Sequence, residues 1–387
     1  MLARRLLRLG FQRRGASQEA PTAAMRDEYD RMDSTGLLHS VRDFRLESGL
    51  VLPEARICYN TFGQLNENRD NLVVVCHALT GNSRLDQWWG TILGPGKALD
   101  TSKYMIVCAN VLGSCYGTTG PASANPLTGQ PYGIDFPEVI TTNLVTESLA
   151  AQVTIRDTVR LHLELVRSGL GVRRVECVVG GSMGGMQALE WGLCGGDFVR
   201  KCVVIGCGAA HTAWQIGISE SQRQAIYMDP LWRGGRVDPA NPPAAGLSVA
   251  RQIAMISYRT AKAYELKFGR ERDLRGDWEV RKYLQYQGRK FQDRFDAVTY
   301  VKLTEQMDTH DVGRGRGGIK AALAGMIPRV LVVGLDSDLL YPTHEQSDLA
   351  SMIPNSSLHI IESINGHDGF LLEHEAVDRA VNQFLSS

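Results

Sequence analysis

The sequence lacks the features that mark several classes of protein. Lysine plus arginine and aspartate plus glutamate number 42 each in 387 residues, so no net charge favours nucleic acid or a strongly charged partner. No apolar run approaches the roughly 20 residues that a transmembrane helix needs. None of the 8 cysteines forms a C-x-x-C pair, which argues against a zinc site and a disulfide framework. We therefore expect an intracellular globular protein with no nucleic-acid and no membrane partner.

The first 25 residues are set apart from the fold. Residues 1–14 are rich in arginine, and no acidic residue precedes Glu19. At helical spacing the leucines and the arginines of this segment fall on different sides, a pattern typical of a mitochondrial transit peptide. The alternatives are a basic tail and a true start at Met25. The expected location is therefore cytoplasmic or mitochondrial.

Buried strands and helices alternate along the rest of the chain. A loosely alternating segment from Ser40 to Phe62, with Gly49 in its middle, predicts an antiparallel hairpin. Helical spacing predicts helices at 154–169 and about 375–385. Continuous apolar runs predict strands covered on both faces at 71–76, 104–109, 175–179, 201–206, 330–334 and 358–362. The alternation predicts an α/β fold with a mostly parallel, doubly wound sheet.

From residue 209 to residue 316 the pattern changes. Strong strand runs are missing there, and helical segments such as Gln215–Tyr227 and Leu247–Tyr258 carry tryptophan, tyrosine, arginine and glutamine. We expect this segment to form a helical lid over the strand ends. The lid would be inserted into a core formed by residues 38–208 and 317–387.

The whole chain is organised around the turn Gly180-Gly-Ser-Met-Gly184. A β-branched run ends in this G-x-S-x-G pattern and a helix follows, which is the context of a nucleophile elbow. Small neighbours allow the strained backbone that exposes the Oγ atom of Ser182, and the N–H of Met183 then faces the position of a tetrahedral oxyanion. Ser182 is the candidate nucleophile. The loop His77-Ala-Leu-Thr-Gly-Asn82 is the second candidate oxyanion element.

A serine nucleophile needs a base and an acid that orients the base. In this fold the acid and then the histidine follow the serine along the chain. Asp336 and Asp338 come after the run 330–334, and His367 comes after the run 358–362, where open α/β sheets place their sites. Spacing alone does not separate Asp336 from Asp338. We expect surface or structural roles for the other histidines, which are His39, His77, His162, His211, His310, His344, His359 and His374.

Several long stretches complete a known pattern. They are Cys76-His-Ala-Leu-Thr-Gly-Asn82, Trp88-Trp89, Gly94-Pro-Gly-Lys-Ala-Leu-Asp100, Ala109-Asn-Val-Leu-Gly-Ser-Cys-Tyr-Gly117, Gly180-Gly-Ser-Met-Gly-Gly-Met-Gln-Ala-Leu-Glu-Trp191, Ala213-Trp-Gln-Ile216 and Gly366-His-Asp-Gly-Phe370. Over roughly residues 38–385 the chain resembles the homoserine O-acetyltransferase family, acyltransferases with the α/β-hydrolase fold.

The resemblance implies a role for each catalytic candidate. Ser182 is the nucleophile and His367 the base. The family's acid occupies a Ser-Asp-x-Leu/Phe-Tyr/Phe-Pro position, which selects Asp338 over Asp336. The N–H groups of Leu79 and Met183 are the implied oxyanion donors.

The resemblance also implies the substrates. Arg251 and Asp368 match the family's substrate-contacting arginine and aspartate, since a guanidinium forks onto the homoserine carboxylate and a carboxylate holds its ammonium. The implied reaction transfers acetyl from acetyl-CoA, a co-substrate, to the hydroxyl of L-homoserine by a ping-pong route through an acyl-serine, on the way to methionine. It needs no cofactor and no metal. Family members are often homodimers.

Two segments depart from the family pattern. Residues Ile140–Gln152 are an insertion before the helix that enters the elbow strand, so they bear on activity. Ala209-Ala-His211 lacks an arginine that the family often has there, which bears on affinity or on the choice of acyl group.

Four alternatives remain. A serine O-acyltransferase and a homoserine O-succinyltransferase share the machinery; the arginine-rich N-terminus favours the former, whereas the elbow and Ala213-Trp-Gln-Ile216 favour a homoserine enzyme. The charges of Arg251 and Asp368 argue against an esterase. An inactive homologue would be expected to lack a member of the catalytic triad, whereas Ser182, Asp338 and His367 are all present and in the expected order.

Overall fold

The computed structural model describes residues 35–138 and 152–387. The expected transit segment 1–25, and all of the expected insertion 140–152 except Gln152, lie outside the described residues.

Within the described residues, eight strands form one sheet in the order β1-β2-β4-β3-β5-β6-β7-β8. Their bounds are β1 Leu37–Arg45, β2 Val51–Phe62, β3 Leu72–Cys76, β4 Met105–Ala109, β5 Val175–Gly181, β6 Val199–Ile205, β7 Arg329–Leu335 and β8 Ser356–Ile361. β1 pairs with β2, and β2 with β4, in antiparallel register. All other neighbours are parallel. The predicted hairpin and the mostly parallel sheet are confirmed.

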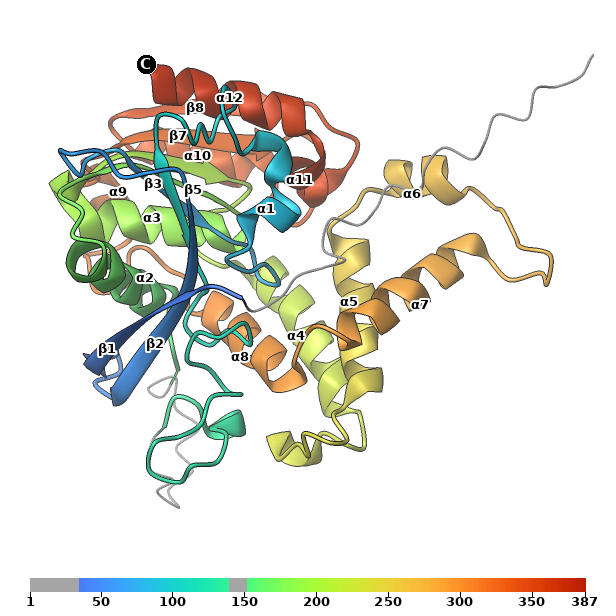
Figure 1. Ribbon diagram of the computed structural model, residues 1–387. Coiled ribbons are helices and arrows are strands. Elements are labelled where there is room, and N and C mark those ends of the chain that lie inside the picture. The colour runs from blue at the N-terminus through green and yellow to red at the C-terminus, as the bar shows by residue number, and fades with distance from the viewer. Residues whose placement is uncertain (1–34, 139–151) are drawn as a thin grey trace, which may run out of the picture.

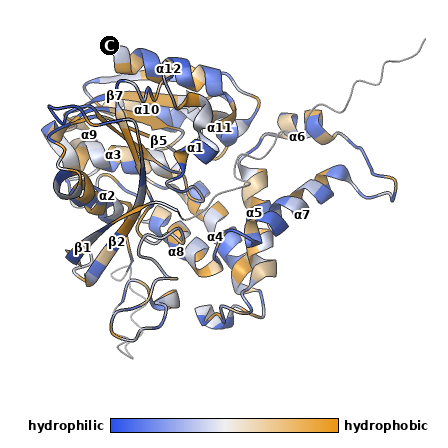
Figure 2. Cartoon of the chain, viewed as in Figure 1, coloured by the Kyte–Doolittle hydropathy of each residue, from blue (hydrophilic) through white to orange (hydrophobic). Residues whose placement is uncertain are grey.

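Burial follows the apolar runs except at one edge. β3 is buried along its whole length, and Figure 2 shows the apolar residues gathered in the sheet and in the helix after β5. β8 differs, because Leu358 and Ile360 are 42% and 37% exposed. The expectation that this run is covered on both faces is wrong: β8 is one of the two edge strands of the sheet, where the covering layers end.

Helices pack on both faces of the sheet (Figure 1). α3 (Met183–Gly195) packs on β3, β5 and β6, and α2 (Ile155–Glu164) packs on α3. On the other side α12 (His374–Ser386) contacts β8. The remaining helices of the core are α1 Leu85–Trp88, α9 Ile319–Ala324, α10 Thr343–Met352 and α11 Gly369–Leu372.

Residues 209–316, here called the helical segment, connect β6 to β7. Its helices are α4 Ala213–Tyr227, α5 Ala244–Ser257, α6 Ala261–Phe268, α7 Glu279–Gln292 and α8 Ala297–Asp308. α5 packs on both α4 and α7, and Figure 1 shows the group beside the sheet rather than on either of its faces.

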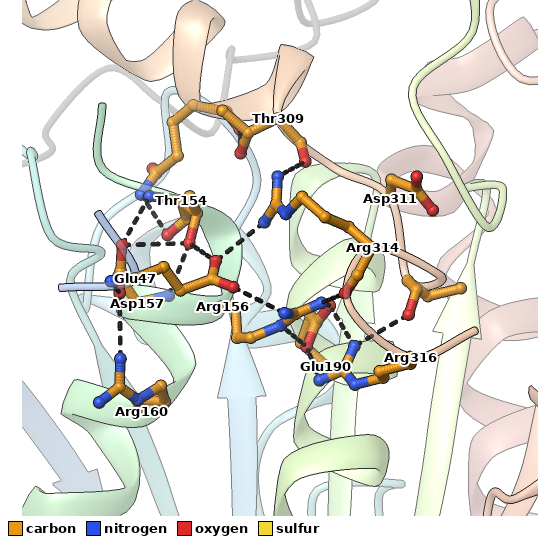
Figure 3. Close-up of polar contacts among 12 residues, drawn as sticks. Glu47, Thr154, Arg156, Asp157, Arg160, Glu190, Thr309, Asp311, Arg314 and Arg316 are labelled. Carbon is orange, nitrogen blue, oxygen red and sulfur yellow. Dashed lines mark hydrogen bonds and ion pairs between the residues drawn. The ribbon is translucent and has the colours of Figure 1, made fainter. Parts of the chain in front are cut away.

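An ion-pair network around the buried Glu190 fixes α3 behind the elbow (Figure 3). Glu190 of α3 has a side chain only 2% exposed and lies 2.7 Å from Nη2 of Arg316 and 3.1 Å from Nε of Arg156. Arg156 also lies 2.6 Å from Glu47, which in turn pairs with Arg314 at 2.8 Å. The network therefore joins the β1–β2 turn, α2, α3 and the end of the helical segment.

The charge of Glu190 is maintained by its partners. Burial raises the pKa of a carboxyl group, but the hydrogen bonds and charges of Arg316 and Arg156 outweigh burial and lower the pKa of Glu190. A buried carboxylate of this kind is stable only while it is paired. The elbow helix is thus held in place by charges as well as by apolar packing.

Candidate active site

The turn between β5 and α3 holds Ser182 in a strained backbone conformation. Its φ is 59° and its ψ is −126°, a region that residues with a side chain rarely adopt. A Cβ atom on Gly184 would collide with the carbonyl oxygen of Cys76, and one on Gly180 with the carbonyl of Gly184. Gly184 is therefore required by close packing of the turn against the end of β3, and Gly180 by close packing within the turn itself. This is the geometry that the G-x-S-x-G pattern predicts.

One aspartate reaches the histidine. Oδ2 of Asp338 lies 2.7 Å from Nδ1 of His367, while its Oδ1 accepts hydrogen bonds from the N–H groups of Leu340 and Tyr341 at 2.8 and 2.9 Å. Asp336 instead accepts a hydrogen bond from the N–H of Ser363. The structure therefore brings Asp338, not Asp336, to His367, as the resemblance implies.

The ring of His367 is buried, and its second nitrogen is unpaired. The residue is 3% exposed, and the ring of Tyr341 stacks on it at 5.0 Å between centroids. Burial lowers the pKa of a histidine, but the adjacent carboxylate of Asp338 outweighs burial and raises the pKa of His367 above 6.5. Its Nε2 makes no hydrogen bond to any described residue, so this atom is available to a proton from Ser182 or a substrate.

The two expected oxyanion donors lie in neighbouring backbone segments. Met183 is the first residue of α3, so its N–H has no partner within the helix. Leu79 lies in the loop after β3, which packs against the elbow through Cys76 and Gly184. The amide of Gln187 joins the two segments, donating to the carbonyls of His77 and Met183 at 3.1 and 3.2 Å.

Arg251 and Asp368 both act electrostatically on Tyr258. Arg251 projects from α5, is 6% exposed, and has its guanidinium 5.1 Å from the ring centroid of Phe291. Burial raises the pKa of Tyr258, the charge of Arg251 lowers it, and the charge of Asp368 raises it. Both charges therefore act on the same phenol, which itself lies 5.9 Å from the His367 ring.

Two further arginines were not expected from the sequence. Arg259 pairs with Asp368 at 2.7 Å, and Arg294 donates to the carbonyl of Thr80 at 3.0 Å and to the hydroxyl of Tyr116 at 2.9 Å. Both come from the helical segment and contact loops of the core. No local pattern identifies them, because each partner lies at least a hundred positions away along the chain.

An arginine also occupies the neighbourhood of His211, although residue 210 is alanine. Nδ1 of His211 lies 3.1 Å from Asp308, and the same carboxylate lies 2.7 Å from Nη2 of Arg223 on α4. Ala209-Ala-His211 therefore has a buried guanidinium nearby that comes from a different element.

No group of three or more His, Cys, Asp or Glu side chains within residues 35–138 and 152–387 is placed to hold a metal ion. None of the helices in these same ranges combines the length and the apolar character that crossing a membrane requires.

An open hollow of about 470 Å³ is lined by Arg167, Arg173, Arg174, Asp197 and Phe198. It lies at the amino ends of β5 and β6, whereas Ser182 lies at the carboxyl end of β5.

Comparison with known proteins agrees with this geometry. A protein-family model described as alpha/beta hydrolase fold matches residues 71–374. The chain is 46% identical over 346 residues to a protein of Chlorobium chlorochromatii named homoserine O-acetyltransferase, covering 89% of this chain and 93% of that protein.

Solved structures share the architecture. A crystal structure of homoserine O-acetyltransferase from Bacillus anthracis has a TM-score of 0.80 at 24% identity, covering 91% of this chain and 97% of that chain. The crystal structure of esterase E22 also has a TM-score of 0.80, at 23% identity, covering 90% and 99%. At these identities the likeness establishes the fold alone, and the fold is shared by transferases and esterases.

Proposed function

The chain belongs to the homoserine O-acetyltransferase family of α/β hydrolases, and we propose that it transfers an acetyl group from acetyl-CoA to the hydroxyl of L-homoserine. The observation that carries this proposal is the pairing of Asp338 with a buried His367 whose Nε2 is unoccupied, in a chain with Ser182 on a strained elbow.

The first half-reaction forms an acetyl-enzyme. His367 takes the proton of the Ser182 hydroxyl as Oγ attacks the thioester carbonyl, and the Asp338 carboxylate stabilises the resulting imidazolium. The N–H groups of Leu79 and Met183 stabilise the oxyanion. The C–S bond then breaks, and His367 returns the proton to the departing thiolate, releasing CoA.

The second half-reaction transfers the acetyl group. The homoserine hydroxyl gives its proton to His367 and attacks the acetyl-serine carbonyl through a second oxyanion at the same site. Ser182 recovers the proton as the ester bond breaks, and O-acetyl-L-homoserine leaves. The chemistry uses acetyl-CoA as a substrate, with no cofactor and no metal.

Charged side chains would select the amino-acid acceptor. In the proposal Arg251 binds the homoserine carboxylate and Asp368 its ammonium, each through charge-assisted hydrogen bonds. The support is that the buried guanidinium of Arg251 and the carboxylate of Asp368 both act on the phenol of Tyr258, beside His367. A pocket for an apolar ester would need neither charge, which disfavours an esterase.

The helical segment would act as a lid. Transfer rather than hydrolysis requires that water be kept from the acetyl-enzyme. Arg259 of this segment contacts the loop that carries His367, and Arg294 contacts the loop after β3. Both contacts support a placement of the helical segment over the site.

The proposal includes a homodimer in an intracellular compartment, cytoplasmic or mitochondrial. The helical segment exposes several large apolar side chains, among them Trp214 at 57%, Met228 at 80% and Leu266 at 69%, and a homodimer interface would cover such side chains. None of the eight cysteines, all of which lie in the described residues, forms a disulfide, and most are buried, which suits a reducing compartment. Light scattering on the purified protein tests the dimer.

A coupled assay that crosses donors with acceptors tests the function. Acetyl-CoA and succinyl-CoA are each combined with L-homoserine, L-serine or no acceptor, and free CoA and acylated product are quantified. We expect rapid turnover only with acetyl-CoA and L-homoserine. Preferred turnover with L-serine, with succinyl-CoA or without an acceptor would instead establish a serine acyltransferase, a succinyltransferase or a hydrolase.

A further inference from the structure

Two buried histidines have no part in the mechanism above. His77 follows β3 and is 0% exposed, and His162 lies in α2 and is 3% exposed. Each ring makes hydrogen bonds only to the backbone among the contacts observed. These hydrogen bonds link both rings to the peptide group of Leu79, whose N–H is the expected oxyanion donor.

The tautomer of His77 follows from its neighbours. The N–H of Val111, which can only donate, lies 3.2 Å from Nε2 of His77, so Nε2 carries the lone pair. Nδ1 lies 2.8 Å from the carbonyl oxygen of Ala78, which can only accept, so Nδ1 carries the proton. The ring is neutral near pH 7: burial, only partly opposed by the bond to Ala78, lowers the pKa of His77 to about 4.

The Ala78 carbonyl and the Leu79 N–H belong to one peptide group. In a planar trans peptide these two groups point in opposite directions. The Ala78 carbonyl accepts hydrogen bonds from Nδ1 of His77 and from the N–H of Gly81, at 2.8 and 2.9 Å. Two donors on one carbonyl fix the peptide plane, and with it the direction of the Leu79 N–H.

His162 donates to the peptide group that in turn donates to His77. Its Nε2 lies 3.1 Å from the carbonyl oxygen of Asn110 and therefore donates to it. That carbonyl shares a peptide group with the N–H of Val111, the donor to His77. The donors consequently run one way, from His162 through the Asn110–Val111 peptide and His77 to the Ala78–Leu79 peptide.

The loop is shaped to the ring of His77. A Cβ atom on Gly81 would lie 2.9 Å from Cβ of His77 and 3.2 Å from its Nδ1. Such contacts are closer than packed side chains allow, so the ring and the bare backbone of residue 81 fit together. The ring is thus part of the structure of the loop and not a side chain accommodated beside it.

We propose that His77 is a positioning residue for acyl transfer, which aims the Leu79 N–H at the oxyanion, and that His162 supports it through the intervening peptide. This rests on the proposed function, in which Leu79 is an oxyanion donor. Hydrogen bonds aligned in one direction polarise one another, so the chain also strengthens Leu79 as a donor. A donor aimed in advance costs no reorganisation when charge develops.

Substitutions at residue 77 separate this role from packing. Asn places an amide N–H near the position of Nδ1 and can still donate to Ala78, whereas Gln and Leu cannot replace that donor. The rate constant of acetyl-enzyme formation is measured by rapid quench with acetyl-CoA alone and intact mass. We expect His77→Leu and His77→Gln to lose on the order of 10²–10³-fold, the usual effect of one oxyanion donor. His77→Asn should stay within about tenfold, and the KM for acetyl-CoA should change little in all three.

His310 is the matched control. It is also buried at 3% exposure, has its pKa lowered to about 4 chiefly by burial, and pairs with a backbone carbonyl, that of Gly208. It has no contact with the loop after β3 among the bonds observed. His310→Leu should therefore lose stability as His77→Leu does and yet acylate at close to the wild-type rate. Equal rate losses in the two variants would overturn the proposal.

A measurement on the unmodified protein guards against variants that fail to fold. Nitrogen-15 NMR of histidine-labelled enzyme should show His77 as the neutral Nδ1–H tautomer from pH 6 to pH 8, and an Nε2–H tautomer would refute the proposal. Ser182→Ala distinguishes a failure of the proposed function from a failure of the proposed role of His77. If that variant still forms an acetyl-enzyme, the proposed function fails; if it does not, while His77→Leu acylates normally, only the role of His77 fails.

Discussion

Nε of Arg259 lies 2.7 Å from a carboxylate oxygen of Asp368. The contact joins the end of α5 to the loop that carries His367, and two hydrogen bonds reinforce it: Asp368 N–H donates to the carbonyl of Tyr258 at 3.1 Å, and the hydroxyl of Thr260 donates to the carbonyl of Ile364 at 2.6 Å. The carboxylate that we propose for the homoserine ammonium is therefore also the anchor of the helical segment. An acceptor that binds there shares it with Arg259.

Arg251→Ala should weaken the binding of the acceptor and leave acylation intact. A charge-assisted hydrogen bond contributes about 1.5–3 kcal/mol, so we expect the KM for L-homoserine to rise about 10–100-fold. Acetyl-enzyme formation from acetyl-CoA alone should stay close to the wild-type rate. Steady-state kinetics and rapid-quench mass spectrometry measure the two quantities.

Arg289→Ala, in the exposed last turn of α7, is the matched control and should leave the KM for homoserine unchanged. An unchanged KM in Arg251→Ala as well would mean that Arg251 does not contact the acceptor.

Asp338→Asn should reduce kcat far more than Asp336→Asn. Only Asp338 contacts His367, so its loss removes the group that sets the tautomer and stabilises the imidazolium, an effect of about 10⁴-fold in a serine protease. Asp336 accepts one backbone hydrogen bond from Ser363, and its replacement should cost less than tenfold. The values of kcat for the two variants are compared at one pH. A larger loss in Asp336→Asn than in Asp338→Asn would overturn the assignment of Asp338 as the acid.

The pH dependence of the reaction should follow His367. The base must be neutral to accept a proton, and the carboxylate of Asp338, which outweighs burial, raises its pKa above 6.5. The value of kcat/KM should therefore fall as the pH drops through a point above 6.5. In Asp338→Asn the raising charge is gone, so the residual activity should persist to lower pH. An acid limb that does not move would show that another group titrates.

Glu190→Gln should destabilise the fold through the network behind the elbow. Removing one partner of a fully buried ion pair costs about 3–5 kcal/mol. We expect a smaller cost here, because the side chains of Arg156 and Arg316 are 13% and 22% exposed, so water screens the charges left behind. The pKa of Glu190 is lowered in the folded state, so its contribution is present above its unfolded value of 4.5 and is lost as the pH falls through the lower folded value. Denaturant titrations at pH 7 and pH 3 should therefore show a larger difference between wild type and variant at pH 7 than at pH 3.

Glu375 is the control for this experiment. Its side chain is 92% exposed and pairs with Arg379 one turn along α12, where solvent screens the charges. Glu375→Gln should leave the unfolding curve unchanged at both pH values. A Glu190→Gln curve equally unchanged would mean that the network adds nothing to stability.

The fold and the order of the candidate catalytic residues could be predicted because they depend on local patterns. Apolar runs of strand length gave β3 to β7, and the glycines around Ser182 gave the elbow, since Gly184 has no room for a side chain against Cys76. The exposure of β8 could not be predicted, because an apolar run does not say whether a helix covers it.

The contacts between the helical segment and the core also could not be predicted from the sequence. The pairing of Arg259 with Asp368 depends on how the end of α5 packs against the loop that carries His367. No sequence pattern near either residue predicts that packing. The sequence predicts only a surface or structural role for His77, because the direction of its hydrogen bonds to Ala78 and Val111 exists only in the folded chain. Both roles depend on the positions of residues that are distant in the sequence, and not on residue type.

The most direct test of the account is the acetyl-enzyme itself. Wild-type protein and Ser182→Ala are each incubated with acetyl-CoA alone, without an acceptor, and their intact masses are measured. Since Ser182 is the proposed nucleophile, the wild type should gain one acetyl group that L-homoserine then removes, and the variant should gain none. An acetyl adduct that forms in Ser182→Ala as fast as in the wild type, and is discharged by L-homoserine, would contradict the account.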